Sequence, residues 1–203
     1  MTEPTYMDQT NNPQRLRQAI ERFSPLQDSD WELLLPHLQE EALRKHKLFV
    51  QEGKRAANVT FVLSGSFRQF YTKNGEEKTT YFYFSGDLMC AYVSCITGQP
   101  SLLTIQALTD CSLLSFPYKV LLDLYRQSPA WQAFGRLIAE YIAMGLEERM
   151  VSLLLQSPEE RYRELLGGSK KKIVEQIPQQ YIANYLGITP VSMSRIRKRL
   201  TTH

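Results

Sequence analysis

Hydrophobic and polar positions follow different patterns in successive parts of this chain. In residues 13–23 and 118–126, apolar side chains recur every three to four positions, which predicts two short amphipathic helices. A further short helix is expected to run from a cap at Ser29 or Asp30 to Leu35. The first dozen residues carry no such pattern and are expected to lack regular structure.

From about residue 40 to residue 117 the pattern changes to short runs of β-branched and apolar residues. Turn residues separate these runs at intervals of about ten residues, a spacing typical of an all-β sandwich or barrel. The turn pairs are Glu52-Gly53, Ser64-Gly65, Asn74-Gly75 and Ser85-Gly86. Of these, Asn74-Gly75 predicts a tight hairpin, because both residues tolerate the positive φ that such a turn needs. The length of the region fits a single roll of about eight strands.

A longer helix is predicted from Ser128-Pro129 to about Leu155. Its apolar side chains recur at alternating steps of four and three residues, as in a coiled-coil seam, which Glu148 interrupts once. The seam consists of Leu137, Tyr141, Met144, Val151 and Leu155, and it is widened by Phe134, Ile138 and Ile142. Two interpretations are open: the helix packs on its own β-domain, or it joins a second subunit. We expect one edge of the helix to do the first and the other edge the second.

The most specific pattern is the segment Gln179–Leu200, QQYIANYLGITPVSMSRIRKRL, which predicts a helix-turn-helix. Such a hairpin needs a small residue where the helices cross, a glycine in the turn and apolar residues that face the core. Ala183 and Gly187 supply the first two. Thr189 is suited to cap the second helix, with Pro190 at its first position. The predicted inward-facing residues are Ile182, Leu186, Met193 and Ile196.

The second helix of this pair is expected to have two distinct faces. Its apolar residues share one side with Leu200, whereas Val191, Arg195 and Lys198 lie on the opposite side. A helix that anchors one face and exposes the other is suited to enter the major groove of DNA, which is about 12 Å wide. The alternative is a purely structural hairpin, in which the run RIRKR only places cations at a helix C-terminus.

Charge is divided unevenly along the chain. Residues 161–200 hold nine Lys or Arg against Glu164 and Glu175, a net charge of +7, whereas residues 1–160 carry a net charge of −4. The total of +3 therefore conceals a basic C-terminal part, which is typical of phosphate-binding surfaces. With 22% charged and 11% aromatic residues, the composition is that of a soluble globular protein and not of a disordered one.

Cysteine and histidine do not predict a metal or catalytic centre. Cys90, Cys95 and Cys111 are odd in number and form no C-x-x-C pair, and the three histidines are far apart in the sequence. Buried free thiols in a reducing compartment are favoured, and a redox role is left open. No export signal is recognisable, and glycine, proline and hydroxyl residues interrupt the uncharged run 88–109. We therefore expect a cytoplasmic protein with no membrane span and no cofactor, and not an enzyme.

The order of these parts resembles the CRP/FNR superfamily of bacterial transcription regulators, over about residues 15–200. The resemblance rests on SGSFRQF after a strand, FSGDL, TGQPS before a strand, GLEERMVSLL leading into the last unit and, most specifically, GITPVSMSRIRKRL. Within the superfamily, the chain is similar to the group common in Bacteroidetes-type bacteria. The resemblance implies an α+β fold with three parts. These are a double-stranded β-helix (jelly roll) sensor domain with N-terminal helices in residues 1–128, a dimerisation helix in 129–155 and a winged-helix-like helix-turn-helix domain in 156–203.

In that family the β-roll often holds cyclic AMP. A glutamate binds the ribose hydroxyl, and an arginine with a neighbouring serine or threonine holds the cyclic phosphate. Alignment over residues 86–107 places Ala91, Ser101 and Leu102 at these three positions. A charge-assisted hydrogen bond to buried phosphate is worth roughly 1.5–3 kcal/mol, so the missing cation predicts that cyclic AMP does not bind with useful affinity.

The sequence does not identify an effector for the β-roll. The clustered cysteines with which similar family members sense oxygen, and the haem ligands with which others sense carbon monoxide, are missing from this sequence. Either the roll binds another small molecule or it serves only as a scaffold. The candidate effector pocket consists of Ala91, Tyr92, Ser94, Ser101 and Leu102.

The resemblance also implies a homodimer that presents two recognition helices about one DNA turn, roughly 34 Å, apart to an imperfect palindrome of double-stranded DNA. Thr189 and Ser192 are expected to bond phosphates, and Val191 and Arg195 to face base edges, with Arg195 the candidate for guanine. The residues expected at the DNA are Thr189, Pro190, Val191, Ser192, Ser194, Arg195, Lys198 and Arg199. Those expected at the dimer interface are Phe134, Leu137, Ile138, Tyr141, Met144 and Val151.

The chain departs from the family at two positions of the second helix, and two other classes of protein are left open. In the family an acidic residue often stands where Val191 is and a basic one where Pro190 is, so the common half-site is not assumed. RNA polymerase is a further possible partner of such a regulator. One alternative is a cupin-like jelly roll that binds or converts a small molecule, but the β-region holds only His46 where such a site needs clustered histidines or paired carboxylates. The other is a cyclic-nucleotide module that acts on a protein partner.

Overall fold

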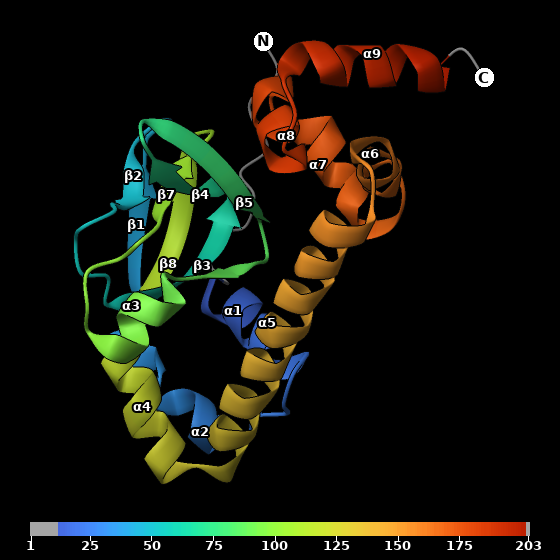
Figure 1. Cartoon of the computed structure of the whole chain (residues 1–203). Helices are drawn as coiled ribbons and strands as arrows, with labels where there is room; N and C mark the ends of the chain where they lie inside the picture. The colour runs from blue at the N-terminus through green and yellow to red at the C-terminus, as the bar shows by residue number, and fades with distance from the viewer. Residues whose placement is uncertain (1–11, 202–203) are drawn as a thin grey trace, which may run out of the picture.

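The computed structural model describes residues 12–201 of the chain. N-terminal helices are followed by a β-roll, a long helix and a C-terminal group of short helices (Figure 1). Of the dozen residues predicted to be irregular, 1–11 lie outside this range, and Asn12 already begins the first helix. No helix in residues 12–201 is long and apolar enough to cross a membrane.

The N-terminal helices follow the predicted order with one shift. Helix α1 spans Asn12–Glu21, α2 spans Asp28–Glu32, and a 3-10 turn follows at Leu35–His37. The cap of α2 is Gln27 and not Ser29 or Asp30, so the prediction was two to three residues late. Asp30 still contributes, because its carboxylate accepts the Gln27 N–H at 3.2 Å from the third helical position.

The β-region is a roll of two four-stranded antiparallel sheets, which confirms the predicted eight-stranded architecture. One sheet has the order β1-β8-β3-β6 and the other the order β2-β7-β4-β5. The strands are β1 (Gln39–Leu43), β2 (Leu48–Val50), β3 (Asn58–Ser64), β4 (Ser66–Lys73), β5 (Glu76–Phe84), β6 (Leu88–Met89), β7 (Thr104–Ala107) and β8 (Cys111–Pro117). The hairpin between β4 and β5 turns at Asn74 and Gly75, whose φ angles are 54° and 79°, as predicted.

Two apolar cores hold the roll and its helices together. The core inside the roll includes Phe67 and Ile105 from one sheet and Val62 and Leu113 from the other, all fully buried. A second core lies where α1, α2 and the outer side of β3 and β8 meet the helices that follow the roll. Trp131, fully buried, is among its largest side chains.

The roll leads into a helical hairpin of α4 (Tyr118–Gln127) and α5 (Pro129–Leu155). Ser128 caps α5 by accepting the Trp131 N–H at 3.3 Å, and it also donates to the Asp30 carboxylate at 2.6 Å. The bounds of both helices match the sequence prediction. A short helix, α3 (Tyr92–Thr97), lies between β6 and β7 and was not predicted. In Figure 1, α5 runs from the base of the roll up to the C-terminal helices.

The C-terminal unit contains α6 (Pro158–Leu165), α7 (Lys171–Gln176), α8 (Gln179–Leu186) and α9 (Pro190–Thr201). Among the described residues no strand follows Pro117, so the expectation of a winged helix is not met in residues 118–201. The stretch GGSKKK forms a 3-10 turn at Gly168–Lys170 and then starts α7, where a strand would have been required for a wing on this side of the hairpin.

Helix α8 docks on the edge strand β5 of the roll. The side-chain amide of Asn184 accepts the Thr79 N–H at 2.6 Å and donates to the Glu77 carbonyl at 2.7 Å. An edge strand leaves its backbone groups unpaired, and here one asparagine satisfies two of them. Phe82 and Phe84 of β5 join the apolar core of the C-terminal unit. The roll therefore fixes the orientation of the helix-turn-helix relative to α5.

Candidate nucleic-acid interface

Helices α8 and α9 form the predicted hairpin, and local sequence explains its turn. Gly187 ends α8 with a φ of 74°, a left-handed conformation that costs glycine little. The Ile188 N–H then bonds the Ala183 carbonyl at 3.0 Å and closes the helix end. Thr189 starts α9 by accepting the Ser192 N–H at 3.2 Å, and Pro190 is the first residue of the helix. These positions agree with the sequence prediction.

The predicted inward-facing residues of the hairpin are buried. Ile182, Ala183 and Leu186 of α8 are inaccessible to solvent, and Met193 and Ile196 of α9 are nearly so. They pack with residues of α6 and α7 in one small core. Burial of this face anchors α9 and leaves its other side outward.

The outward side of α9 carries most of the residues predicted to meet DNA. Val191 is 62% exposed, which leaves its methyl groups open to a partner. The other exposed members are Thr189, Pro190, Ser194, Arg195, Lys198 and Arg199, and Ser192 is half-buried. The hydroxyl of Thr189 is already used, because it caps α9 and donates to Ser192 Oγ at 3.0 Å.

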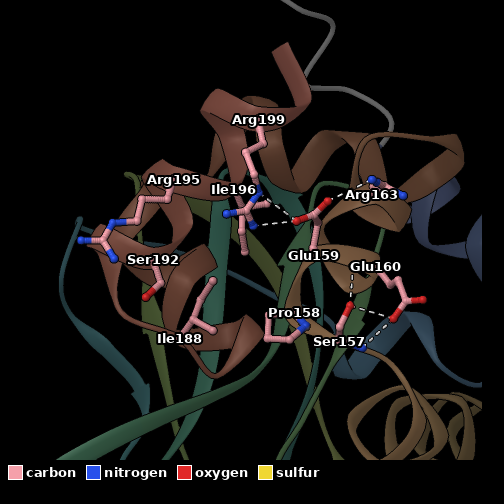
Figure 2. A pocket seen from close by; sticks show the side chains of 10 residues that line it. All are labelled: Ser157, Pro158, Glu159, Glu160, Arg163, Ile188, Ser192, Arg195, Ile196 and Arg199. Carbon is pink, nitrogen blue, oxygen red and sulfur yellow. Dashed lines mark hydrogen bonds and ion pairs between the residues drawn. The ribbon is translucent and has the colours of Figure 1, made fainter. Parts of the chain in front are cut away.

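Glu159 of α6 lies between two of the arginines near this surface (Figure 2). One carboxylate oxygen accepts two hydrogen bonds from Arg199, at 2.6 and 3.2 Å, and the other accepts one from Arg163 at 2.9 Å. The hydrogen bonds from Arg199 hold the pKa of the Glu159 carboxyl below its usual range. Arg199 is therefore partly neutralised within the protein, which the sequence prediction did not include.

A hollow of about 670 Å³ opens between α6 and α9 beside this cluster. It is lined by Ser157, Pro158, Glu159, Glu160, Arg163, Ile188, Ser192, Arg195, Ile196 and Arg199. Arg195 stands at its edge and points away from the two glutamates in Figure 2. Arg195 is thus an exposed cation of α9 that extends outward from the hollow.

Arg161 departs from the predicted basic surface. It is only 8% exposed, and its guanidinium donates to the backbone carbonyls of Gln156 at 2.6 Å, Ser152 at 3.3 Å and Leu186 at 2.8 Å. These carbonyls belong to the end of α5, the residue after it and the end of α8. Arg161 joins α5, α6 and α8 and is not a surface cation, so its charge does not contribute to the basic surface predicted from residues 161–200.

Most of the candidate effector residues of the roll are buried or form hydrogen bonds within their own loop. Ser94 donates to the Gln99 carbonyl at 2.6 Å and accepts the Ala56 N–H at 3.1 Å. Ser101 donates to the Leu103 carbonyl at 2.8 Å and is 3% exposed. Ala91 is buried, Tyr92 is half-buried, and Leu102 is 73% exposed, so Leu102 faces solvent and does not line an enclosed pocket. The prediction that these five residues converge on a ligand is therefore corrected.

The side of the roll near α5 is occupied by a chain of polar and aromatic side chains. Tyr83 donates to the Gln69 amide oxygen at 2.8 Å, and the Gln69 amide nitrogen donates to Thr80 at 3.1 Å. The ring of Tyr81 lies 4.8 Å from that of Tyr83, measured between centroids. Burial raises the pKa of the Tyr83 phenol well above its ordinary value. These uncharged groups offer no cation to an anionic ligand.

The buried arginine of the roll, Arg68, faces the C-terminal unit. Its guanidinium donates to Gln106 at 2.7 and 2.9 Å and to Glu77 at 2.5 Å. It lies over the rings of Phe70 and Tyr181, 4.1 and 4.2 Å from their centroids. Since Tyr181 belongs to α8, Arg68 stabilises the docking of α8 on the roll. Neither Arg68 nor Asn184 was identified from the sequence, because nothing local shows which helix covers an outer face of a sheet.

The first half of helix α5 packs one side into the chain's own core, and the rest of the helix is largely exposed to solvent. Phe134 is 3% exposed and lies edge-on against the rings of Trp131 and Phe23. It therefore belongs to the chain's own core, and its placement in a dimer interface was wrong. Leu137 is half-buried, and Ile138 is half-buried against the same core.

The rest of α5 presents a broad apolar surface. Tyr141, Met144 and Val151, predicted from the seam, are between 43% and 57% exposed. Further exposed apolar residues were not predicted: Leu146, Met150, Leu153 and Leu154. They form a second stripe at helical spacing. This stripe is not part of the predicted seam, because Leu146 and Leu153 lie on the opposite side of the helix. We name the exposed set Tyr141, Met144, Leu146, Met150, Val151, Leu153, Leu154 and Leu155 the α5 apolar surface.

Comparison with known proteins shows similarity in one part of the sequence and in the overall fold. Residues 40–128 match the family of the cyclic nucleotide-binding domain. The fold is similar to that of FixK2 from Bradyrhizobium japonicum, with a TM-score of 0.67 and 21% identity over 81% of this chain and 85% of that one. It is also similar to a protein from Eubacterium rectale described as a CRP/FNR-family transcriptional regulator, with a TM-score of 0.66 and 19% identity over 87% and 84% of the two chains.

The Catabolite Activator Protein of Thermus thermophilus matches with a TM-score of 0.56 and 23% identity, over 91% of this chain and 87% of that one. No curated protein matches the sequence significantly. Residues 40–128 are thus similar to the cyclic nucleotide-binding domain, and the chain shares the fold of these solved structures, in agreement with the fold implied by the resemblance drawn from its motifs. The Bacteroidetes-type grouping stays a prediction.

Proposed function

We propose that this chain is a homodimeric, sequence-specific DNA-binding transcription regulator of the CRP/FNR type, acting in the cytoplasm. The observation that carries the proposal is the division of α9 into two faces. Met193 and Ile196 are buried in the C-terminal core, whereas Val191 and Arg195 are exposed. A structural hairpin would gain nothing from an exposed valine and arginine in this position, whereas a major-groove reader needs both an anchored and an open face.

The α5 apolar surface supports the dimer. Contiguous exposed apolar side chains on one helix are unusual for a monomeric protein and mark an interaction site. Pairing α5 with its copy around a two-fold axis would bury one side of this surface, the stripe of Leu146, Met150, Leu153 and Leu154, and set two α9 helices on one side of the dimer. The corresponding DNA site is an imperfect palindrome with half-sites about one turn, roughly 34 Å, apart. Selection of bound sequences from random DNA tests this directly, because a monomer would return a single half-site.

We expect replacement of Arg195 by alanine to weaken binding to the selected palindrome more than to random DNA. A bidentate arginine–guanine contact is worth about 1–3 kcal/mol of discrimination, which corresponds to about a 5- to 150-fold loss. Competition gel shifts with cognate and random duplexes measure it. Arg55→Ala, which removes the same charge from an exposed position on the roll, is the matched control. Equal losses on both duplexes would show that Arg195 binds phosphate and reads no base.

We also expect no cyclic AMP response. The positions that carry a glutamate and an arginine in cyclic-AMP-binding relatives hold Ala91 and Ser101, and both are buried and uncharged. Isothermal titration calorimetry with cyclic AMP is therefore expected to give no binding heat up to millimolar ligand, a ceiling of about −4 kcal/mol on the binding free energy. Retained binding of the same sample to selected DNA shows that the protein is folded. Micromolar or tighter binding would contradict this part of the proposal.

A further inference from the structure

One carboxylate stands beside the exposed face of α9. Glu159 lies in the first turn of α6, and its side chain is 28% exposed. Figure 2 shows it between Arg199 of α9 and Arg163 of its own helix, whose side chains are each 60% exposed. Arg199 donates through both Nε and Nη2 to one oxygen of this carboxylate, and Arg163 donates to the other oxygen. Glu159 therefore links two exposed cations of different helices.

Arg199 lies at one edge of the exposed face of α9. It follows Arg195 by four residues, about 40° further around the helix, whereas Ile196 between them is buried. A helix with its side chains is about 10–12 Å across and the major groove about 12 Å wide, so the edges of a helix in the groove lie next to the phosphates. On the proposed function, on which this inference rests, Arg199 and Glu159 therefore lie where one phosphate strand would pass.

A carboxylate in this place opposes a phosphate strand in two ways. It repels the phosphates directly, and it occupies guanidinium N–H groups that would otherwise bond them. The hydrogen bond from Arg199 lowers the pKa of the Glu159 carboxyl, so the carboxyl is ionised at neutral pH. Glu160, the next residue, has a different role, because its carboxylate accepts the Ser157 N–H at 2.8 Å and the Ser157 hydroxyl at 2.7 Å and so caps α6.

We propose that Glu159 withholds Arg199 from the DNA backbone and thereby limits the sequence-independent affinity of the protein for DNA. This affinity comes from cations that neutralise phosphates and release counterions. A regulator with many such contacts stays on random DNA, because a genome offers far more random sites than specific ones. By removing one phosphate contact from each subunit, Glu159 leaves a larger share of the binding free energy to base contacts such as that proposed for Arg195.

Glu159→Gln in the full-length chain tests the proposal, because glutamine keeps the size of the side chain and removes its charge. Fluorescence anisotropy with a labelled random-sequence duplex at several KCl concentrations measures the affinity. A dimer that gains one phosphate contact in each subunit steepens the slope of log affinity against log salt by about 1.8. We therefore expect about tenfold tighter binding at about 50 mM salt, and a gain that falls by about tenfold at about 200 mM.

Three other outcomes would count against the inference. Weaker binding of Glu159→Gln would show that Glu159 orients the arginines toward phosphate, and unchanged binding would show that these side chains do not meet DNA. Either result overturns the inference and leaves the proposed function standing, because the natural chain still binds. If the natural chain bound no duplex at low salt, the proposed function itself would be overturned, and this inference with it.

Two further variants locate the effect at Arg199. Glu160→Gln removes the same charge from the adjacent position, and glutamine still suits a capping box, so an equal gain in this variant would reduce the effect to net charge and overturn the proposal. Arg199→Met is expected to cost the natural chain little affinity, but to remove most of the gain when combined with Glu159→Gln. An equal loss in both backgrounds would show that Arg199 already binds phosphate. The pairs are exposed, so each variant is expected to unfold close to the natural chain.

Discussion

Replacing both Met150 and Leu154 with aspartate is expected to convert the proposed dimer into monomers. The two side chains are 55% and 74% exposed in the single chain, so the substitutions leave the fold of the protomer intact. In the dimer each substitution would place an unpaired carboxylate in an apolar interface. Because the dimer is symmetric, this happens in both subunits. Burial of such charges costs several kcal/mol, so we expect the dimer dissociation constant to rise at least about a thousandfold, or about 4 kcal/mol.

Light scattering and analytical ultracentrifugation at micromolar protein measure this change. Gln132→Asp is the control, because it adds one carboxylate to an exposed position of α5 outside the α5 apolar surface. Ile138 is unsuitable for such a test, since it packs against the chain's own core and its replacement would destabilise the protomer. A double variant that still sediments like the natural chain would exclude the stripe of Leu146, Met150, Leu153 and Leu154 from the interface.

Replacing Arg161 with methionine is expected to destabilise the C-terminal unit by about 3–5 kcal/mol. Methionine fills much of the same space but leaves the carbonyls of Gln156 and Leu186 without their donor, and buried unsatisfied groups cost roughly 1–3 kcal/mol each. The loss is large compared with the 5–15 kcal/mol typical of a folded domain. We expect the thermal unfolding midpoint, followed by circular dichroism, to fall by roughly 10 °C or more.

Arg163→Met separates this effect from a simple loss of charge. Arg163 lies on the same helix, its side chain is 60% exposed, and it makes one surface ion pair with Glu159. Surface pairs contribute at most about 1 kcal/mol, so this control is expected to unfold close to the natural chain. If Arg161→Met were equally benign, the hydrogen bonds that join α5, α6 and α8 would contribute little to stability.

The helix-turn-helix could be predicted from sequence because its determinants are local. The turn conformation follows from Gly187, the start of α9 from Thr189 and Pro190, and the buried faces from residues three and four positions apart. The same holds for the β4–β5 hairpin, where Asn74-Gly75 fixes the turn. In each case the residues that decide the structure are neighbours in the chain. The outward position of Arg195 follows from the same periodicity.

The predictions that failed depended on partners distant in the chain. Nothing in the sequence around Phe134 shows that Phe23 and Trp131 will surround it. The hydrogen-bond partners of the Ser94 and Ser101 hydroxyls are likewise set by the folded loop and cannot be read from the sequence. Arg161 was counted as a surface cation because its charge is visible in the sequence while the carbonyls that bind it are not. The wing was expected from a family resemblance, not from a strand pattern in residues 166–178.

The sequence alone thus determined most of the elements, their order and the two faces of α9, since these follow from backbone preferences and helical or strand periodicity over short distances. Only the tertiary structure decided which polar side chains are hydrogen-bonded within the protein, and how α8 docks on β5 through Asn184 and Arg68. The physical reason is that burial and hydrogen bonding between distant segments depend on how the elements pack, and a residue's accessibility is a property of that packing and not of its neighbours in the chain.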